Sequence, residues 1–314
     1  MIQRRLLFLR KFSLLFKQFV AYVKGDGGVV ESVDYLYSKF TQAPNASILQ
    51  IPTSYKTSVL YNQEPFNPSE DFDVIRNSNV FRGAPNGLLE EIGVNVPCID
   101  YSTGEPLLLT QPQSTNFIRY SEDFTAWSVA TAGILTSNAT ESPTGNVDAT
   151  ELLSIGTSES IYIESMGILS AGDYTYSIYV KYKDGDIKFN FRVGGAGSSS
   201  SLFLITENDV TLISSIERTS IENVGNGWFR VSVGFISNGI DSTNAQLRGD
   251  FELPYNGFYV WGAQVEQQPF ATSYIPTNGS VATRLQDQIG NAGSTDTINS
   301  EQGVLYFEGA ALTN

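Results

Sequence analysis

Histidine is absent from this 314-residue chain, and cysteine occurs once, at Cys98. Neither a Cys/His zinc site nor a Ser-His-Asp triad can be assembled from such a composition, and Cys98 has no partner for an intrachain disulfide. A large chain without disulfides is typical of a protein that folds in a reducing cytoplasm. We therefore predict no metal site and no cofactor.

Charged residues are also scarce, at 17% of the chain, and they are unevenly distributed. Residues 1–24 carry six basic side chains and no acidic one, a charge of +6. The remaining residues carry 13 of the 19 basic and all 33 of the acidic side chains, a charge of −20. Because an acidic body repels phosphate backbones, we predict that the protein does not bind nucleic acid.

The amino-terminal segment lacks the long apolar run of a signal peptide or a membrane span, because Arg10 and Lys11 interrupt it. Residues 1–24 instead repeat apolar side chains at the spacing of an amphipathic helix. The apolar face holds Phe8, Phe12, Leu15, Phe16, Phe19 and Val23, and Arg10 and Lys17 lie opposite. We favour a helix that docks on a protein partner or self-associates. The alternatives are packing on the chain's own body and contact with a membrane surface.

Four regions are predicted along the chain. They are a helical anchor over residues 1–46, an irregular connector over 47–115, a β-sandwich over 116–285, and a linker with the start of a further β domain over 286–314. Seven prolines within 47–115 exclude long helices there. This leaves an extended connector with a few short strands, such as 88–92 and 107–109.

Residues 116–285 change to a period of two, which is the spacing of half-buried strands. Tyr174, Tyr176, Ile178, Val180 and Tyr182, for example, alternate with more polar residues. Asp184-Gly185 and Asn226-Gly227 are turn pairs of the kind that close tight hairpins, and the glycines and serines of 194–201 predict a flexible loop. These patterns predict a mainly β chain and an antiparallel β-sandwich with two solvated outer faces.

The tryptophans are candidates for sugar contacts, because an indole face suits the apolar face of a sugar ring. Trp228 and Trp261 are out of phase with their apolar neighbours Phe229 and Val260, which favours an outward position for one of them. Tyr259 is in the same situation. The alternative is core packing, since aromatic residues dominate sandwich cores. The candidate glycan-binding residues are therefore Trp228, Trp261 and Tyr259.

No residue is assigned a catalytic role. A depolymerase needs two carboxylates at a defined separation, and 33 acidic residues make chance pairs unavoidable. Asp184-Gly185-Asp186 has the chemistry of a turn and lacks the spacing of a calcium loop. Cys98 has no histidine to activate it. We predict that the protein is not an enzyme.

Several segments of the chain occur in an order that is typical of one group of proteins. They are residues 86–90, 94–97, 99–101, 107–109, 111–113, 115–116, 120–124 and 127–128, followed by 179–181, 225–233, 259–266, 270–277, Thr283-Arg284 and Asp287. In this order they resemble fibre and appendage proteins of tailed bacteriophages, including Bacteroidetes-infecting and crAss-like phages, over about residues 47–309. Residues 303–309 resemble the start of a lectin-like domain. Cys98 and Ser114 stand where that family usually has arginine, so contacts made there by arginine do not carry over.

The resemblance implies a sandwich of the jelly-roll or carbohydrate-binding-module type on a tail or head fibre, a structural adhesin of the virion. It implies attachment to another virion protein of the capsid, collar or tail, a homo-oligomer with a trimer as the expected number, and a host surface glycan as a ligand. The residues expected to dock on the virion are Phe8, Phe12, Phe16, Phe19, Arg10 and Lys17. The protein would fold in the host cytoplasm before assembly. The alternatives are a polysaccharide-depolymerising tailspike whose catalytic part is not in this chain, and a secreted bacterial glycan-binding module.

Overall fold

The computed structural model describes residues 48–64, 70–131, 133–153, 160–195, 199–215, 217–250 and 256–297. The predicted amino-terminal helix and the predicted strand at 303–309 lie outside the described residues. Within these ranges the chain forms antiparallel strands and a short 3-10 helix, η2 (Phe124–Ala126). No helix among them is long and apolar enough to cross a membrane.

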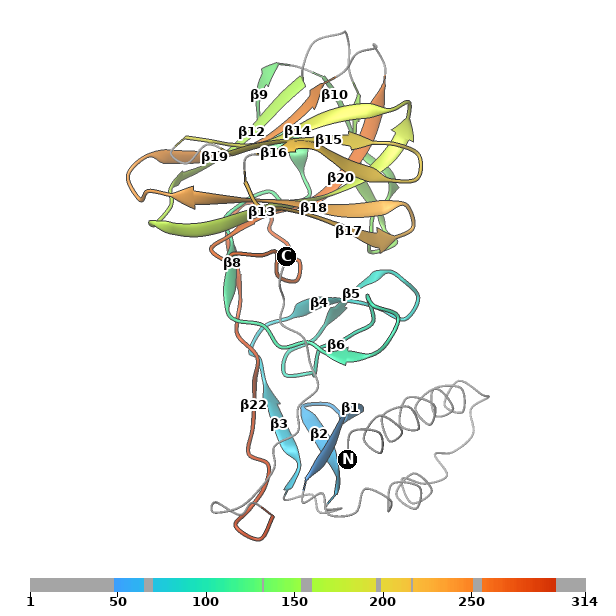
Figure 1. Cartoon of the computed structure of the whole chain (residues 1–314), viewed down its shortest axis with the longest axis vertical. Helices are drawn as coiled ribbons and strands as arrows, with labels where there is room; N and C mark the ends of the chain where they lie inside the picture. The colour runs from blue at the N-terminus through green and yellow to red at the C-terminus, as the bar shows by residue number, and fades with distance from the viewer. Residues whose placement is uncertain are drawn as a thin grey trace, which may run out of the picture.

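Two six-stranded antiparallel sheets stack face to face and form a sandwich (Figure 1). The junction sheet has the order β10 (Ile134–Glu141), β11 (Val147–Leu153), β20 (Gly257–Glu266), β13 (Gly172–Asp184), β18 (Trp228–Ser237) and β17 (Thr219–Gly225). The open sheet has the order β16 (Val210–Ser215), β15 (Ser199–Ile205), β14 (Ile187–Gly194), β19 (Ser242–Asp250), β12 (Ser160–Ile168) and β9 (Ser128–Thr131). The predicted mainly β fold class and antiparallel sandwich are confirmed.

The core between the sheets is built from the apolar side of each alternating strand. Tyr176 of β13 and Phe191 of β14 stack across it with ring centroids 3.8 Å apart. Phe189 and Phe203 stack on neighbouring strands of the open sheet at 5.2 Å. All four rings are fully buried. Because a buried aromatic side chain removes ~150–250 Å² from water, these residues contribute much of the hydrophobic stabilisation.

The two predicted hairpins have different outcomes. Asn226-Gly227 closes the antiparallel pair β17–β18, and its φ angles of 53° and 77° are the positive values that a tight hairpin turn requires. The hairpin predicted at Asp184-Gly185 is wrong, because β13 and β14 belong to opposite sheets. The turn carries the chain from one layer of the sandwich to the other, and β13 pairs with β18 and β20.

The segment 194–201 is also more regular than its composition predicts. Ser199, Ser200 and Ser201 begin β15 and pair with Val193, Arg192 and Phe191 of β14. The serines adopt strand geometry because a neighbouring strand accepts and donates the ladder hydrogen bonds. A flexible loop over the whole of 194–201 is therefore wrong for its last three residues.

The connector is a stalk on one side of the sandwich, built from small antiparallel sheets (Figure 1). Its largest sheet has the order β1 (Leu49–Lys56), β2 (Val59–Glu64), β3 (Phe72–Ile75) and β22 (Gln288–Gly290). The two-stranded sheets are β4 (Val80–Gly83) with β5 (Leu89–Ile92), β6 (Ile99–Asp100) with β7 (Leu107–Leu108), and β8 (Ser114–Asn116) with β21 (Ala282–Arg284). Strands predicted at 88–92 and 107–109 are present as β5 and β7. Because β22 pairs with β3, the chain after the sandwich returns along the stalk, where the sequence predicts a linker.

The outward side of the junction sheet is covered by the stalk, which corrects the prediction of two solvated outer faces. Strands β18 and β20 are each buried at nine of their ten positions, so both sides of the sheet are packed. The covering layer is the β4–β5 hairpin together with residues 270–277, which we call the closing segment. The open sheet lies on the far side of the sandwich from the stalk (Figure 1).

Candidate functional site

An aromatic cluster joins the stalk to the sandwich. Trp228, Trp261 and Tyr179 project from the junction sheet, and Tyr274 of the closing segment and Phe81 of β4 pack against them. Ring centroids lie 4.5 Å apart for Trp261 and Tyr274, and 5.5 Å apart for Phe81 and Tyr274. Aromatic pairs at such separations gain ~0.5–1.5 kcal/mol beyond the area they bury. We call these five residues the junction cluster.

A bulge in β20 allows Trp261 to face the stalk while the next residues return to the core. The register with β13 shifts between Ser177 and Tyr179, where Gly262 stands at a φ of 64°. A Cβ atom on Gly262 would lie 2.9 Å from Cδ2 of Tyr179. Only glycine suits both the positive φ and this close approach. Beyond the bulge, Ala263 belongs to the core between the sheets.

The structure buries both candidate tryptophans. Trp228 and Trp261 are each 1% exposed, and Nε1 of Trp228 donates a hydrogen bond to the carbonyl oxygen of Glu141 at 3.1 Å. Both tryptophans lie on the side of the junction sheet away from the core, as the alternation with Phe229 and Val260 predicts. The stalk covers this side of the sheet. The expectation that one indole presents a solvent-facing ring to sugar is therefore wrong. Tyr259 is half-buried beside the junction cluster, and its contact with glycan stays a prediction.

Buried polar groups fasten the closing segment to the junction sheet. The carboxylate of Glu266, which is 0% exposed, accepts hydrogen bonds from Oγ of Ser114, Nε2 of Gln264 and Oγ1 of Thr272, each at 2.6 Å. It also accepts one from the backbone N–H of Thr272 at 2.8 Å. Arg230 donates to the carbonyl oxygen of Thr272 at 2.6 Å. Since about four acceptor positions of the carboxylate are used, Glu266 is committed to holding the closing segment.

Glu122 is a second carboxyl at this junction. Its Oε1 accepts a hydrogen bond from the hydroxyl of Tyr274 at 2.8 Å, and that hydroxyl lies 2.7 Å from Oγ of Ser121. Burial raises the pKa of Glu122 above its ordinary value, the hydrogen bond from Tyr274 lowers it, and the neighbouring carboxyl of Asp148 raises it further. Raised carboxyl pKa values occur in catalytic acids, but also in structural networks. Here the hydrogen-bond partner is a buried tyrosine of the junction cluster.

The outward side of the open sheet has a different chemistry. Its central strands β14 and β19 place Lys188, Asn190 and Arg192 beside Asn244, Gln246 and Arg248. The six strands of this sheet contain two acidic residues, Glu164 and Asp250. Glu164 is buried and accepts from Nε of Arg119 at 2.8 Å, and Asp250 stands opposite Lys188 in the register. We call the six basic and amide residues of β14 and β19 the open face.

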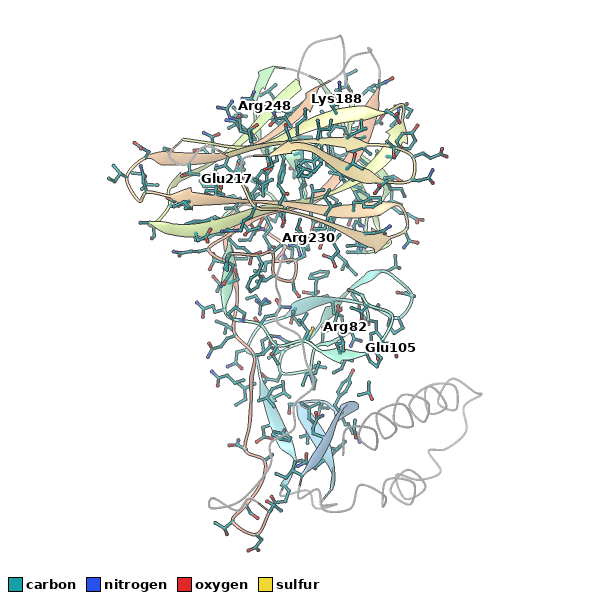
Figure 2. The ribbon with its side chains drawn as sticks, in the orientation of Figure 1. Arg82, Glu105, Lys188, Glu217, Arg230 and Arg248 are labelled. Atoms are coloured by element: carbon teal, nitrogen blue, oxygen red, sulfur yellow. The ribbon has the colours of Figure 1, made fainter. Side chains whose placement is uncertain are left out.

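Hydrogen bonds within the open face hold its side chains in place. Arg248 donates to Oε1 of Gln246 from Nε at 2.9 Å and from a terminal nitrogen at 2.6 Å. Nε2 of Gln246 donates to Oδ1 of Asn244 at 2.6 Å. On β15, Oγ of Ser200 donates to Oδ1 of Asn190 at 2.9 Å. Figure 2 shows Lys188 and Arg248 on the side of the sandwich turned away from the stalk. The alternation in β14 marks Lys188, Asn190 and Arg192 as outward in the sequence, but it does not show that the polar residues of β19 lie beside them.

Two clefts beside the stalk offer little room for a ligand. Their volumes are about 150 and 250 Å³, and the smaller is lined by Phe81, Glu91 and Tyr274, among others. Pockets for small molecules usually measure ~300–1,000 Å³. In the described residues, no group of three or more Cys, Asp or Glu is placed to hold a metal ion. The open face is thus the best-formed candidate surface.

Comparison with known proteins identifies no family: no family model and no curated protein matches the chain. Among solved structures, the chain is similar to the enzymatically active domain of tailspike protein 4 of bacteriophage CBA120, with 8% identity and a TM-score of 0.30 over 46% of this chain and 20% of that one. It is also similar to the CBM22-1 xylan-binding domain of Paenibacillus barcinonensis Xyn10C, with 10% identity and a TM-score of 0.31 over 50% of this chain and 94% of that one.

A third similar structure contains the CBM22-1 and GH10 modules of a Clostridium thermocellum xylanase, with 15% identity and a TM-score of 0.30, over 53% of this chain and 30% of that one. The chain therefore spans less than a third of the tailspike and xylanase structures that it matches. At these identities and TM-scores the likenesses assign neither a family nor a function. The class of the protein, an antiparallel β-sandwich on a β-rich stalk, rests on its own strand pairing.

Proposed function

We propose that this chain is a structural, non-enzymatic protein of a tailed-phage virion, a fibre or adhesin subunit that presents a glycan-binding sandwich outward. The main support for the proposal is the position in the fold of the segments that resemble phage fibre proteins. Segments 225–233, 259–266 and 270–277 supply Trp228, Trp261 and Tyr274 to the junction cluster. Three separate segments that resemble phage fibre proteins thus contribute to one joint.

The joint mounts the sandwich on the stalk at more than one point. The backbone N–H of Leu89 donates to the carbonyl oxygen of Pro143 at 2.8 Å. A Cβ atom on Gly225 would lie 3.2 Å from the carbonyl oxygen of Gly87, so the stalk and the β17–β18 turn approach closely. Close backbone contacts and a packed aromatic cluster resist bending. A fibre module needs such stiffness to hold a binding surface away from the particle.

The layout of the two sheets supports an outward-facing binding role. One face of the sandwich is used for the stalk, and the other carries amides and cations on the far side. The best-hydrogen-bonded buried carboxylate, Glu266, is occupied by structural partners, which supports a binding protein over a hydrolase. The protein would fold in the host cytoplasm and be assembled on the capsid, collar or tail as a homo-oligomer.

Labelling of purified particles tests the proposal. An antibody against the sandwich, imaged by electron microscopy, should decorate one defined site on the head, neck or tail. The purified full chain should retain host polysaccharide in a pull-down without releasing reducing ends from it. Particles free of the protein would refute the virion role. Release of reducing ends by the purified chain would favour a depolymerising tailspike instead.

A further inference from the structure

We propose that the open face binds an acidic, carboxylate-bearing saccharide, with Arg192 and Arg248 as the carboxylate-binding residues. This inference rests on the proposed glycan-binding function and names the ligand class for it. The first reason is charge. The chain carries a net charge of −14, yet β14 and β19 bring Lys188, Arg192 and Arg248 together at outward positions of one sheet, with Asp250 opposite Lys188 in the register.

Acidic residues border this face at both ends, and Asp241 directly precedes β19 at the Asn244 end. Asp250 stands opposite Lys188, and the turn residues Glu207 and Asp209 follow the strand that pairs with that end of β14. Arg192 and Arg248 stand in the two outward register rows between these ends. Charges beyond about 8 Å are largely screened at physiological salt, so the acidic body of the protein weakens this local attraction only partly.

The geometry of the antiparallel pair sets the spacing of the two guanidinium groups. Arg192 stands opposite Gln246, and Arg248 is two residues further along β19. Such diagonal neighbours have Cα atoms ~7–8 Å apart, which lets two long side chains contact one or two adjacent sugar units. Guanidinium groups bind carboxylates bidentately, whereas ammonium groups act as point charges.

The rest of the open face suits the hydroxyl groups of a sugar. Asn190 and Asn244 bring half-buried amide groups, and Ser200 adds a hydroxyl on the next strand. Gln246 is 8% exposed and serves to hold Arg248 and Asn244. The hydrogen bonds from Arg248 to Gln246 and from Gln246 to Asn244 fix these groups before a ligand arrives. Preorganised side chains lose less entropy on binding. The outward positions of β14, β15 and β19 hold no aromatic residue. Such a surface lacks the rings on which a neutral saccharide could stack.

Affinity electrophoresis of the full chain tests the inference, with polygalacturonate, alginate or hyaluronan in the gel as carboxylated probes and dextran as the neutral one. We expect retardation by at least one carboxylated probe and none by dextran. Arg192→Gln and Arg248→Gln should each weaken binding roughly tenfold or more, because each removes a charge-assisted contact. Arg192→Lys should also weaken it, since the charge is kept but the bidentate geometry is lost.

Arg218→Gln is the matched control, because it removes the same charge from an exposed ion pair with Asp173 on the junction sheet. It should leave the affinity within about twofold of the wild type, as a rim pair away from the ligand contributes little. Circular dichroism and thermal melts confirm that each variant is folded. Unchanged binding by folded Arg192→Gln and Arg248→Gln would overturn the inference.

The remaining outcomes separate this inference from the proposed function. Binding of dextran as strong as that of the carboxylated probes overturns the inference and leaves glycan binding intact. Equal retardation by single-stranded DNA overturns it as well, because the face would then attract any polyanion. If neither carboxylated nor neutral polysaccharide is retained, the glycan-binding function fails together with the inference.

Discussion

Arg76 and Asp287, which are 211 residues apart in the sequence, form a buried ion pair in which Nη1 of Arg76 lies 2.9 Å from Oδ1 of Asp287. Their side chains are 0% and 3% exposed. Arg76 also donates to the carbonyl oxygens of Ser78, Gly93 and Val96, and Oδ2 of Asp287 accepts from the backbone N–H of Gln111. The pair ties the segment after the sandwich to the start of the stalk.

Asp287→Ala should therefore destabilise the protein strongly. It leaves the guanidinium of Arg76 buried without its counter-ion, a change that costs about 3–5 kcal/mol. Chemical denaturation followed by circular dichroism would measure the loss. The control is Glu90→Ala, which breaks the Arg82–Glu90 pair at a half-exposed carboxylate. It should cost no more than about 1 kcal/mol, and equal losses for the two variants would contradict a structural role for the buried pair.

Trp261→Ala should lower stability without a specific effect on glycan binding. Removal of a buried tryptophan usually costs about 3–5 kcal/mol, and Trp261 packs against both Tyr179 and Tyr274. Thermal melts would show the loss, and affinity electrophoresis at a temperature where the variant is folded should show unchanged retention. Tyr259→Ala is the control for stability only, because the half-buried Tyr259 lies at the edge of the cluster and should cost less than Trp261→Ala. If Trp261→Ala had normal stability but no longer bound glycan, the hypothesis that Trp261 stacks on a sugar ring would be supported again.

Glu122→Gln should stabilise the protein at neutral pH and have little effect in acid. The folded-state pKa of Glu122 is raised, mainly by burial, so the folded state binds this proton more tightly than the unfolded state does. Stability then falls as the pH rises from the unfolded pKa through the folded pKa, and the penalty is complete above the latter. The amide introduced by the substitution carries no charge, and its carbonyl oxygen can still accept the hydrogen bond from Tyr274.

Melting temperatures at pH 4 and pH 7.5 measure this effect. The variant should melt higher than the wild type at pH 7.5, and the difference should shrink at pH 4. Glu207→Gln, at an exposed turn position, is the control for the loss of one negative charge. A destabilised variant at pH 7.5 would mean that the charge of Glu122 strengthens the Tyr274 hydrogen bond by more than its burial costs.

The two-residue alternation of apolar and polar residues, together with the turn-forming residue pairs, predicted much of the sandwich. The alternation in β13 marks its buried side correctly, and Asn226-Gly227 closes a hairpin because both residues adopt a positive φ. The turn at Asp184-Gly185 has equally suitable residues, yet it joins opposite sheets. A turn pair determines that the chain reverses, whereas the partner of each strand is decided by which long-range pairing completes the core.

The covered side of the junction sheet was the harder feature to predict. Trp228 beside Phe229 indicates a strand with large apolar residues on both sides, but periodicity does not reveal what covers the second side. Here the cover comes from β4 and from the closing segment, which lie far apart in the sequence. The open face could not be predicted from periodicity either, because its residues come from two different strands. Arg192 and Arg248 are ordinary outward residues of two strands, and only the register brings them together.

The full chain is expected to form a homo-oligomer, with a trimer as the most consistent number for a fibre. Identical subunits usually associate with closed rotational symmetry, and several copies of one weak glycan site gain avidity when they are joined. Sedimentation velocity at micromolar concentration should show a species of about three times the 34.4 kDa chain mass. A monomer under these conditions would contradict the prediction.

We predict that residues 1–24 form an amphipathic helix that attaches the protein to the virion. The phenylalanine stripe of Phe8, Phe12, Phe16 and Phe19 is too apolar to stay in water on a soluble protein without a partner. Burial of one such side chain contributes roughly 1.5–3 kcal/mol, so losing two should weaken a docking site markedly. Arg10 and Lys17, on the opposite face, would meet acidic surface on a neighbouring virion protein and orient the helix.

Deletion of residues 1–24, or Phe12→Ser with Phe16→Ser, should therefore leave the sandwich folded and prevent incorporation into particles. The sandwich is unaffected because its core and the junction cluster are formed by residues after 80. The assay complements a phage that lacks the gene and probes purified virions with an antibody against the sandwich. Arg10→Ser with Lys17→Ser is the companion variant, and it should slow incorporation without abolishing it, because charge contributes more to the rate of encounter than to affinity. Incorporation of the deleted form at the wild-type level would exclude the helix as the anchor and move the attachment site to residues 29–115.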